Sequence, residues 1–135
     1  MLHEFASSVF EDICKEYIRR LQKANALPFR YSRMGRWWGK TTVRRKDGTE
    51  LADTEIDLLA ISKQSDKYLV GECKFKGKPF RYSEYLDTIV KLSAYKNNAE
   101  FFYYLFSESG FDEKIVEAAN NDSHIVLCGL DEIVR

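Results

Sequence analysis

The sequence predicts an α/β fold in which a mixed sheet is flanked by helices. Two apolar runs of strand length, residues 56–61 and 68–75, follow a hairpin signal at Asp47-Gly48. Helical spacing then returns over residues 82–96, and further short apolar runs come after it. Because a helical crossover joins parallel strands, we expect antiparallel strands before this helix and parallel strands after it.

The first element is an amphipathic helix over residues 5–23, whose apolar side chains recur at helical spacing. Ser7 or Ser8 could cap its N-terminus, and Glu11 stands three residues after Ser8, where a capping box has its carboxylate. Glu11 also lies at the border of the apolar arc, from which it could point along the sheet. Pro28 excludes a continuation of this helix.

The elements after this helix complete an αβββαβ core. Residues 37–45 have the pattern of an extended segment, and a turn at residues 64–66 separates the two apolar runs. Beyond the crossover helix, the sequence predicts an aromatic strand at residues 101–106, a helix at residues 112–121, a strand at residues 125–128 and a last helical turn from Asp131. Neither a linker nor an internal repeat is evident, so we expect residues 1–135 to form a single domain.

Composition and charge limit the classes of function. The chain is 44% hydrophobic and 31% charged, as globular domains are. Neither a signal peptide nor an apolar stretch of about 20 residues is evident, so we expect a cytoplasmic protein without membrane contact. The formal net charge is zero, so any affinity for nucleic acid must come from local clusters of basic residues.

The metal ligands that the sequence offers are oxygen atoms. Cys14, Cys73 and Cys128 are far apart in the sequence and lie among apolar residues, which predicts reduced core cysteines. The chain has only two histidines, which disfavours a histidine-based transition-metal site. A metal ion would therefore have to be held by carboxylates.

Charged side chains interrupt the two apolar runs: Asp57 lies in the first, and Glu72 and Lys74 lie in the second. A carboxylate in a core strand is destabilising unless its charge is compensated, and a bound cation is one such compensation. Since side chains alternate along a strand, Glu72 and Lys74 share a face, and Asp57 can approach Glu72 if the two strands pair. The other explanation is an Asp57–Lys74 salt bridge at a sheet edge, with Glu72 solvated.

This arrangement predicts a site for phosphodiester hydrolysis. Asp57 and Glu72 can hold one Mg²⁺ together with waters and a phosphate oxygen. The ion would stabilise charge on the scissile phosphate and lower the pKa of a bound water. Lys74 would orient the attacking water or stabilise the pentacovalent phosphorane.

Basic and aromatic residues around these positions could bind DNA. Trp37 and Trp38 could stack on unpaired bases, although one could equally lie in the core while the other packs against the first helix. A plain solvated basic face is the alternative to a DNA track. The residues expected to contact phosphates are Arg33, Arg36, Lys40, Arg44, Lys76 and Lys78.

Three segments carry a resemblance to a known superfamily: Phe10-Glu11, residues 55–57 (EID) and residues 71–74 (GECK). In this order they resemble the PD-(D/E)XK nucleases, near the archaeal Holliday-junction resolvases and type IV restriction enzymes. The run at residues 33–38 (RMGRWW) is similar to a domain of unknown function that follows the P-loop module of archaeal-type ATPases. The resemblance implies a restriction-endonuclease-like fold. It also implies a catalytic set of Glu11, Asp57, Glu72 and Lys74, in which Glu11 joins Asp57 and Glu72 at the metal.

These observations together predict a Mg²⁺- or Mn²⁺-dependent endodeoxyribonuclease. Its expected partners are DNA and a P-loop ATPase module in cis or in trans, since the chain has no GxxxxGK[ST] sequence of its own. It could also form a homodimer. We expect Asp57→Ala to abolish cleavage and leave folding intact. The alternatives are a catalytically silent nucleic-acid-binding or regulatory module of an ATPase, and a protein-interaction domain that uses Trp37 and Trp38.

Overall fold

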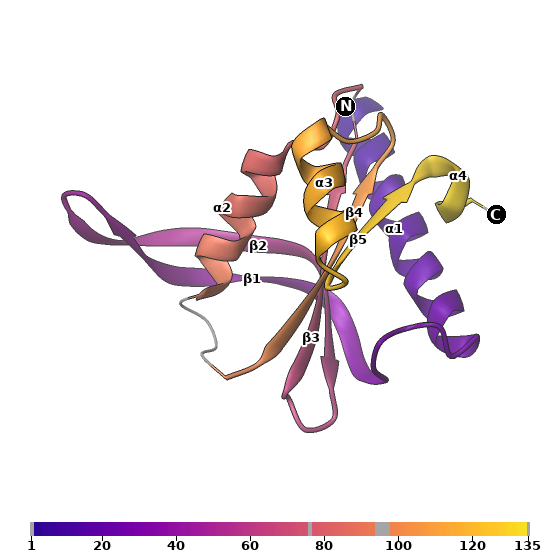
Figure 1. Ribbon diagram of the computed structural model, residues 1–135, viewed down its shortest axis with the longest axis horizontal. Helices are drawn as coiled ribbons and strands as arrows, with labels where there is room; N and C mark the ends of the chain where they lie inside the picture. Colours follow the sequence, from indigo (N-terminus) through magenta and orange to yellow (C-terminus); the bar gives the residue numbers. More distant parts are fainter. Residues whose placement is uncertain (1, 76, 94–97, 135) are drawn as a thin grey trace.

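The computed structural model of the chain has a five-stranded sheet with helices on both faces (Figure 1). It describes residues 2–75, 77–93 and 98–134, leaving aside the side chains of residues 2–6, 41–45, 50–52 and 93. The elements are α1 (Leu2–Lys23), β1 (Tyr31–Arg45), β2 (Gly48–Ser62), β3 (Lys67–Lys74), α2 (Tyr82–Ser93), β4 (Glu100–Ser107), α3 (Glu113–Asn121), β5 (Ile125–Gly129) and α4 (Leu130–Ile133). Among the described residues, no helix is long and apolar enough to span a bilayer.

The sheet has the strand order β1-β2-β3-β4-β5. The β1–β2 and β2–β3 pairs are antiparallel, whereas the β3–β4 and β4–β5 pairs are parallel. The change of direction comes at α2, the crossover helix, as the spacing of the sequence predicts. The predicted α/β class with a mixed, helix-flanked sheet is confirmed.

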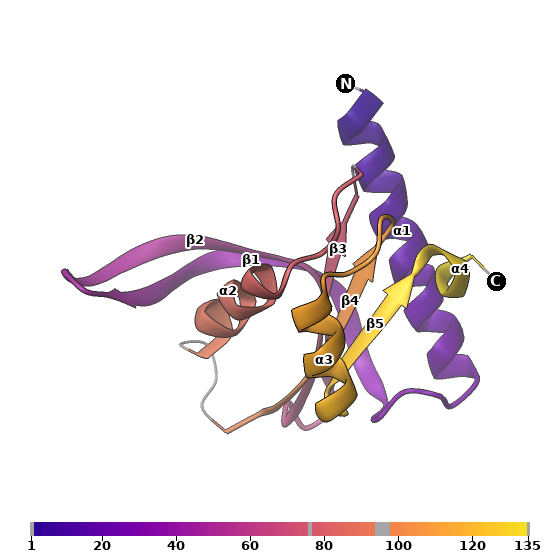
Figure 2. The same cartoon turned by 45° about the horizontal axis from the view of Figure 1, so that its top comes forward.

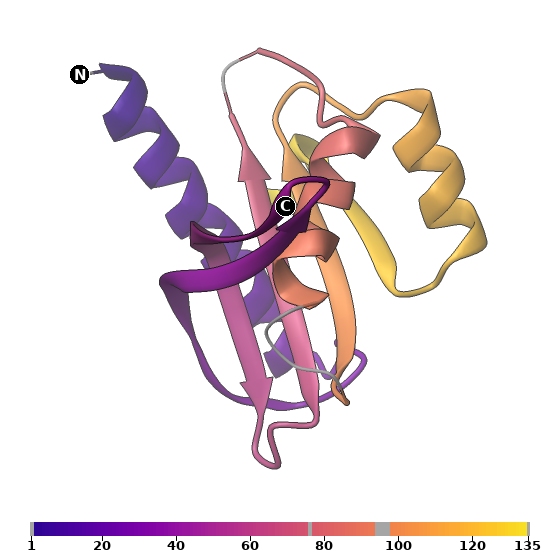
Figure 3. The same cartoon turned by 90° about the vertical axis from the view of Figure 1, so that its left-hand side faces the viewer.

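Helices cover the two faces of the sheet, with α1 and α4 on one side and α2 and α3 on the other (Figures 2 and 3). On the first face, Ile18 of α1 and Ile133 of α4 pack with Leu69 of β3. On the second face, Leu92 of α2 packs with Val70 of β3. Leu69 and Val70 therefore mark which face each later residue of β3 points to, because side chains alternate along a strand.

The sheet divides between β2 and β3. Their pairing ends at Leu58 and Gly71, after which β2 continues with β1 as a two-stranded ribbon that projects away from β3, β4 and β5 (Figure 1). Close packing sets this last pair, since a Cβ added at Gly71 would lie 2.9 Å from Leu58 Cβ. The predicted residues Asp57 and Glu72 are the first ones beyond it, so both stand where the two strands separate.

Several local predictions were wrong, and the ends of elements account for most of them. Helix α1 begins at Leu2, so Ser7 and Ser8 lie inside it and Glu11 is not the carboxylate of a capping box. Strands β1 and β2 are much longer than predicted: β1 begins at Tyr31, where it pairs with the core end of β2, and β2 begins at Gly48, in the ribbon beyond the apolar core. The hairpin at Gly48 and the turn before β3 are both confirmed.

Candidate active site

Asp57 reaches the site through a β-bulge. Trp37 pairs with Ile56 and Gly35 pairs with Leu59, so β2 uses three residue steps where β1 uses two. An extra residue of this kind bends its strand and re-aims the side chains beside it. The Asp57 carboxylate turns toward β3, where its Oδ2 accepts a hydrogen bond from the backbone N–H of Cys73 at 3.0 Å. It thereby bridges the two strands at the point where their backbone pairing has ended.

Glu72 and Lys74 lie on the face of the sheet that α2 covers, since they alternate with Val70 along β3. Lys74 Nζ donates to Glu84 Oε2 of α2 at 2.5 Å. Cys73 points to the opposite face, where its thiol is hydrogen-bonded with Cys14 of α1. Glu72 and Lys74 therefore share one face of the sheet, as predicted. Lys74 forms its ion pair with Glu84 and not with Asp57.

Arg36 of β1 joins the carboxylates of α1 and β2. Its Nη2 contacts Glu11 Oε1 of α1 and lies 3.8 Å from Asp57 Oδ1. Its Nη1 lies 3.2 Å from Glu55 Oε1. One guanidinium thus contacts three carboxylates, two of which belong to the predicted catalytic set.

Glu11, Asp57 and Glu72, which we call the carboxylate cluster, influence one another electrostatically. Burial and then the charge of Asp57 raise the pKa of Glu72 from 4.5 to about 8. Burial raises the pKa of Asp57, against the opposing effects of the Cys73 N–H and the Arg36 guanidinium. Burial, followed by the charge of Asp57, also raises the pKa of Glu11. Three acids from three elements therefore lie close enough for their negative charges to repel, with Glu11 reaching the separation of β2 and β3 from the α1 side of the sheet and Glu72 from the α2 side.

The donor atoms of the carboxylate cluster fit a hard cation such as Mg²⁺ or Mn²⁺, because all of them are carboxylate oxygens. Their present arrangement is not that of a ligand shell: within the described part of the chain, no three Asp, Glu, His or Cys side chains are gathered as a metal site. Arg36 instead contacts two of the three acids. The cluster thus has the chemistry of a cation site, with a guanidinium partly compensating its charge.

The residues predicted to contact phosphates have different surroundings. Arg33 and Lys78 are exposed, whereas Arg36 is bound to the carboxylates and Lys40 Nζ lies 3.2 Å from Asp53 Oδ1. Lys76 lies outside the described residues, and so does the side chain of Arg44. Acids of β2 therefore face the basic residues of β1, which the order of residues within β1 could not indicate.

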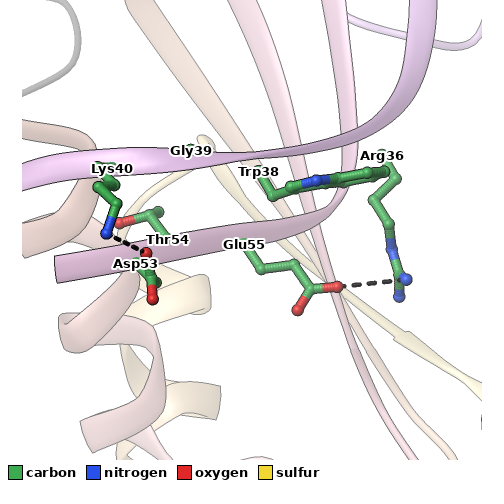
Figure 4. Close-up of a pocket in the computed structure, with 7 residues that line it drawn as sticks. All are labelled: Arg36, Trp38, Gly39, Lys40, Asp53, Thr54 and Glu55. Atoms are coloured by element: carbon green, nitrogen blue, oxygen red, sulfur yellow. Dashed lines mark ion pairs between the residues drawn. The ribbon is translucent and has the colours of Figure 1, made fainter.

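The two tryptophans of β1 have opposite environments. Trp37 is half-buried against Ile56 and Leu59 on the α2 side of the sheet. Trp38 is 67% exposed and lines a surface pocket of about 540 Å³ on the ribbon (Figure 4). Of the two alternatives, Trp37 follows the one in which a tryptophan packs on the core, although it stays half-buried, and Trp38 does not pack against the first helix. The pocket is lined by Arg36, Trp38, Gly39, Lys40, Asp53, Thr54 and Glu55.

Two residues of this region were missed in their present roles. Arg36 was expected to contact DNA, and only the register between β1 and β2 brings it to Glu11 and Asp57. Glu84 lies ten residues after Lys74, on another element, and its sequence gives no sign that it receives the ammonium group. Both contacts depend on how the elements pack.

Comparisons with known proteins give relatives without an assigned activity. The model of the family DUF234, described as archaeal and bacterial proteins of unknown function, matches residues 1–87. An uncharacterized protein of Methanocaldococcus jannaschii is 34% identical over 74 residues, which make up 55% of this chain and 14% of that protein. The chain thus spans about a seventh of the length of this curated relative. A crystal structure of a protein of unknown function has a similar fold, with a TM-score of 0.51 and 16% identity, over 87% of this chain and 56% of the other.

Proposed function

The chain belongs to the DUF234 family of archaeal and bacterial proteins of unknown function, and we propose that it hydrolyses DNA phosphodiester bonds with a divalent metal ion. The reaction would take place at the carboxylate cluster, where β2 and β3 separate. The order of the catalytic residues along the chain supports this proposal through its resemblance to the PD-(D/E)XK nucleases. The restriction-endonuclease-like character of the fold is part of the same proposal.

The observation that carries the proposal is the state of Glu72. Its carboxyl group has a pKa of about 8, because it is buried beside Asp57. Within the described part of the chain no hydrogen bond or ion pair reaches the Glu72 carboxylate, and the charge of Lys91 on α2 only partly offsets the burial and the charge of Asp57 that raise its pKa. A divalent ion shared with Asp57 would stabilise both ionised groups. Strongly perturbed carboxyl groups of this kind are typical of functional sites.

The residues of the cluster would divide the work of binding and catalysis. Glu11, Asp57 and Glu72 would hold Mg²⁺ or Mn²⁺, which when bound polarises a phosphate oxygen and acidifies a water molecule. Lys74 stands two residues from Glu72 on the same face and would orient the attacking water. Glu84 accepts a hydrogen bond from the Lys74 ammonium group, so it fixes the position of this group.

The decisive experiment compares Asp57→Asn with the native chain on supercoiled plasmid, branched DNA and single-stranded DNA in Mg²⁺ or Mn²⁺. Asparagine retains a side-chain oxygen that can accept the Cys73 N–H, whereas alanine would leave this donor without its acceptor, which costs about 1–3 kcal/mol. We therefore revise the expectation that Asp57→Ala leaves folding intact. Asp57→Asn should fold normally and lose metal-dependent cleavage by a factor of about a hundred or more.

The matched control for this experiment is Glu117→Gln, which removes an exposed carboxylate from α3 on a different part of the surface. It should cleave like the native chain, and Lys74→Ala should lose activity as Asp57→Asn does. Equal cleavage by the native chain and by Asp57→Asn would exclude the carboxylate cluster as the active site.

A catalytically silent module is the second candidate, and the contacts of Arg36 favour it. A guanidinium that already compensates Glu11 and Asp57 reduces the need for a metal ion. The length of the M. jannaschii relative also agrees with a module that acts beside other domains, of which a P-loop ATPase is the one we propose. Salt-sensitive DNA binding without metal-dependent nicking by the native chain would support this candidate.

A further inference from the structure

The geometry points to Trp38 as a platform on which an unpaired nucleobase stacks when DNA lies at the carboxylate cluster. This inference rests on the proposed function, since it names the class of DNA that the same site would take. The base would belong to a loop, a fork or a single strand, because a paired base inside a duplex already has both of its faces covered by its neighbours.

The first observation is the exposure of an aromatic ring. Trp38 is 67% exposed, the largest fraction among the exposed large apolar side chains of the described part of the chain, and the others are aliphatic. Trp37, its neighbour, faces the core cluster on the other side of the ribbon. An indole ring offers a flat apolar surface, and stacking on such a ring is how many proteins hold unpaired bases without regard to sequence.

The second observation is the composition of the pocket beside the ring. Lys40 and Asp53 form an ion pair on one side of the pocket, and Arg36 and Glu55 form another on the opposite side (Figure 4). A nucleobase has apolar faces and a polar edge, and it is joined to phosphates. Carboxylates can accept hydrogen bonds from base amino groups, and the two cations can contact the flanking phosphates. The pocket therefore combines an apolar ring with charges of both signs, which matches the apolar faces, polar edge and phosphates of a nucleotide.

The third observation is continuity with the carboxylate cluster. Arg36 and Glu55 line the pocket, and the same Arg36 guanidinium contacts Glu11 and Asp57. Arg36, Trp38 and Lys40 alternate along β1 and so share one face of the ribbon. A DNA strand that follows this face from the cluster meets Arg36 first and then Trp38. A base held at Trp38 would thus fix the position of the strand relative to Glu11 and Asp57, the acids that Arg36 contacts.

The test measures binding in EDTA, so that cleavage plays no part. The probes are a fluorescently labelled duplex that carries an unpaired thymidine loop and a fully paired duplex of the same length. Trp38→Ala should weaken binding of the looped probe about tenfold, which corresponds to about 1.4 kcal/mol, and should change binding of the paired duplex less than about twofold. Trp38→Phe should retain most of the affinity, because phenylalanine keeps an aromatic face. Val116→Ala, at an exposed apolar side chain of α3, is the control and should bind both probes as the native chain does.

A spectroscopic measurement reports stacking directly. The looped probe should quench the tryptophan fluorescence of the native chain and of Val116→Ala, and it should quench Trp38→Ala much less, since Trp37 is half-buried on the other face of the ribbon. Equal affinity of Trp38→Ala and the native chain for the looped probe would overturn the inference. So would a dimer that Trp38→Ala dissociates, because the ring would then be a contact between two copies of the chain. If Trp38→Ala weakens binding and the native chain cuts nothing in Mg²⁺ or Mn²⁺, the stacking platform stands and the nuclease proposal fails. If the native chain and Trp38→Ala cleave looped DNA equally well, the nuclease proposal stands and the stacking platform fails.

Discussion

Glu72→Gln should remove part of the pH dependence of the free energy of unfolding. The pKa of Glu72 is raised in the folded chain to about 8, from 4.5 in an unperturbed glutamate. Below pH 4.5 the side chain is protonated in both the folded and the unfolded states. Between pH 4.5 and about 8 the unfolded chain loses this proton while the folded chain keeps it, so the free energy of unfolding decreases as the pH rises. The decrease is complete above about pH 8, where both states are ionised.

The size of the effect follows from the same two values. A rise in pKa from 4.5 to about 8 corresponds to about 5 kcal/mol of less favourable ionisation in the folded chain. The carboxyl group of Glu72 is buried but the residue as a whole is partly exposed, so water that reaches it and small movements of Asp57 lower this figure, and we expect about 2–3 kcal/mol. Glutamine has nearly the same shape and no charge, so Glu72→Gln removes this contribution without leaving a cavity.

Urea unfolding in EDTA at about pH 5 and about pH 9 measures the effect. The free energy of unfolding of Glu72→Gln minus that of the native chain should be about 2–3 kcal/mol larger at the higher pH than at the lower, because only the native chain loses stability as the pH rises. Glu117→Gln is the control, and its difference from the native chain should not vary with pH, because this carboxylate is exposed. A pH-independent difference for Glu72→Gln would show that Glu72 ionises as it does in water, and the main support for a cation site would be lost.

Two further substitutions test the surroundings of the cluster. Arg36→Gln should lower the free energy of unfolding by about 1 kcal/mol near neutral pH without metal, because Glu11 and Asp57 lose their shared cation, and thermal melts should show a larger stabilisation by Mn²⁺ than in the native chain. Arg19→Gln is the control: it removes an exposed ion pair with Glu16 and should alter neither the free energy of unfolding nor the stabilisation by Mn²⁺. If Mn²⁺ stabilises Arg36→Gln less than it stabilises the native chain, the guanidinium and the ion do not compete. Gly71→Ala should destabilise the chain by about 1–3 kcal/mol in urea unfolding, because its Cβ would lie 2.9 Å from Leu58 Cβ and force β2 from β3. Gly35→Ala is its control, since a Cβ there has no atom within 4 Å, and equal effects of the two glycine substitutions would mean that the close pairing of β2 and β3 is not needed.

The order and direction of the elements could be predicted because they depend on local patterns. The apolar runs of β2 and β3, the turn between them and the helical spacing of α2 are each contained in a short segment. The β1 half of the ribbon and its turn were predicted, but its β2 half, residues 48–55, was not, because this part of β2 lies beyond the core and lacks continuous apolar residues. The start of α1 was misplaced for a related reason: Ser7 and Ser8 resemble a cap, but the helix continues through them to Leu2.

The candidate site could be predicted in part, because each acid was visible as an interruption of an apolar pattern. Alternation along β3 correctly placed Glu72 and Lys74 on one face. The bulge in β2 could not be foreseen, and it decides that Asp57 turns to the Cys73 N–H. The ion pairs of Arg36 depend both on the register between β1 and β2 and on the packing of α1, so the sequence of one segment could not predict them.

The separation of β2 from β3 links the fold to the chemistry. Where two strands part, the backbone of each loses its partner, and a buried N–H without an acceptor is destabilising. Asp57 satisfies the Cys73 N–H, and this hydrogen bond favours the ionised carboxylate at a place where burial opposes it. The same separation leaves Glu72 beside Asp57 without backbone from β2 between them. Asp57, which stabilises the separation of the two strands, thus has its ionised form favoured by the Cys73 N–H, while burial and the charge of Asp57 raise the pKa of Glu72 to about 8. This pair can receive a divalent ion only when Glu72 gives up its proton. Binding of Mn²⁺ should therefore release protons at about pH 7, which isothermal titration calorimetry in buffers of different ionisation enthalpy can detect.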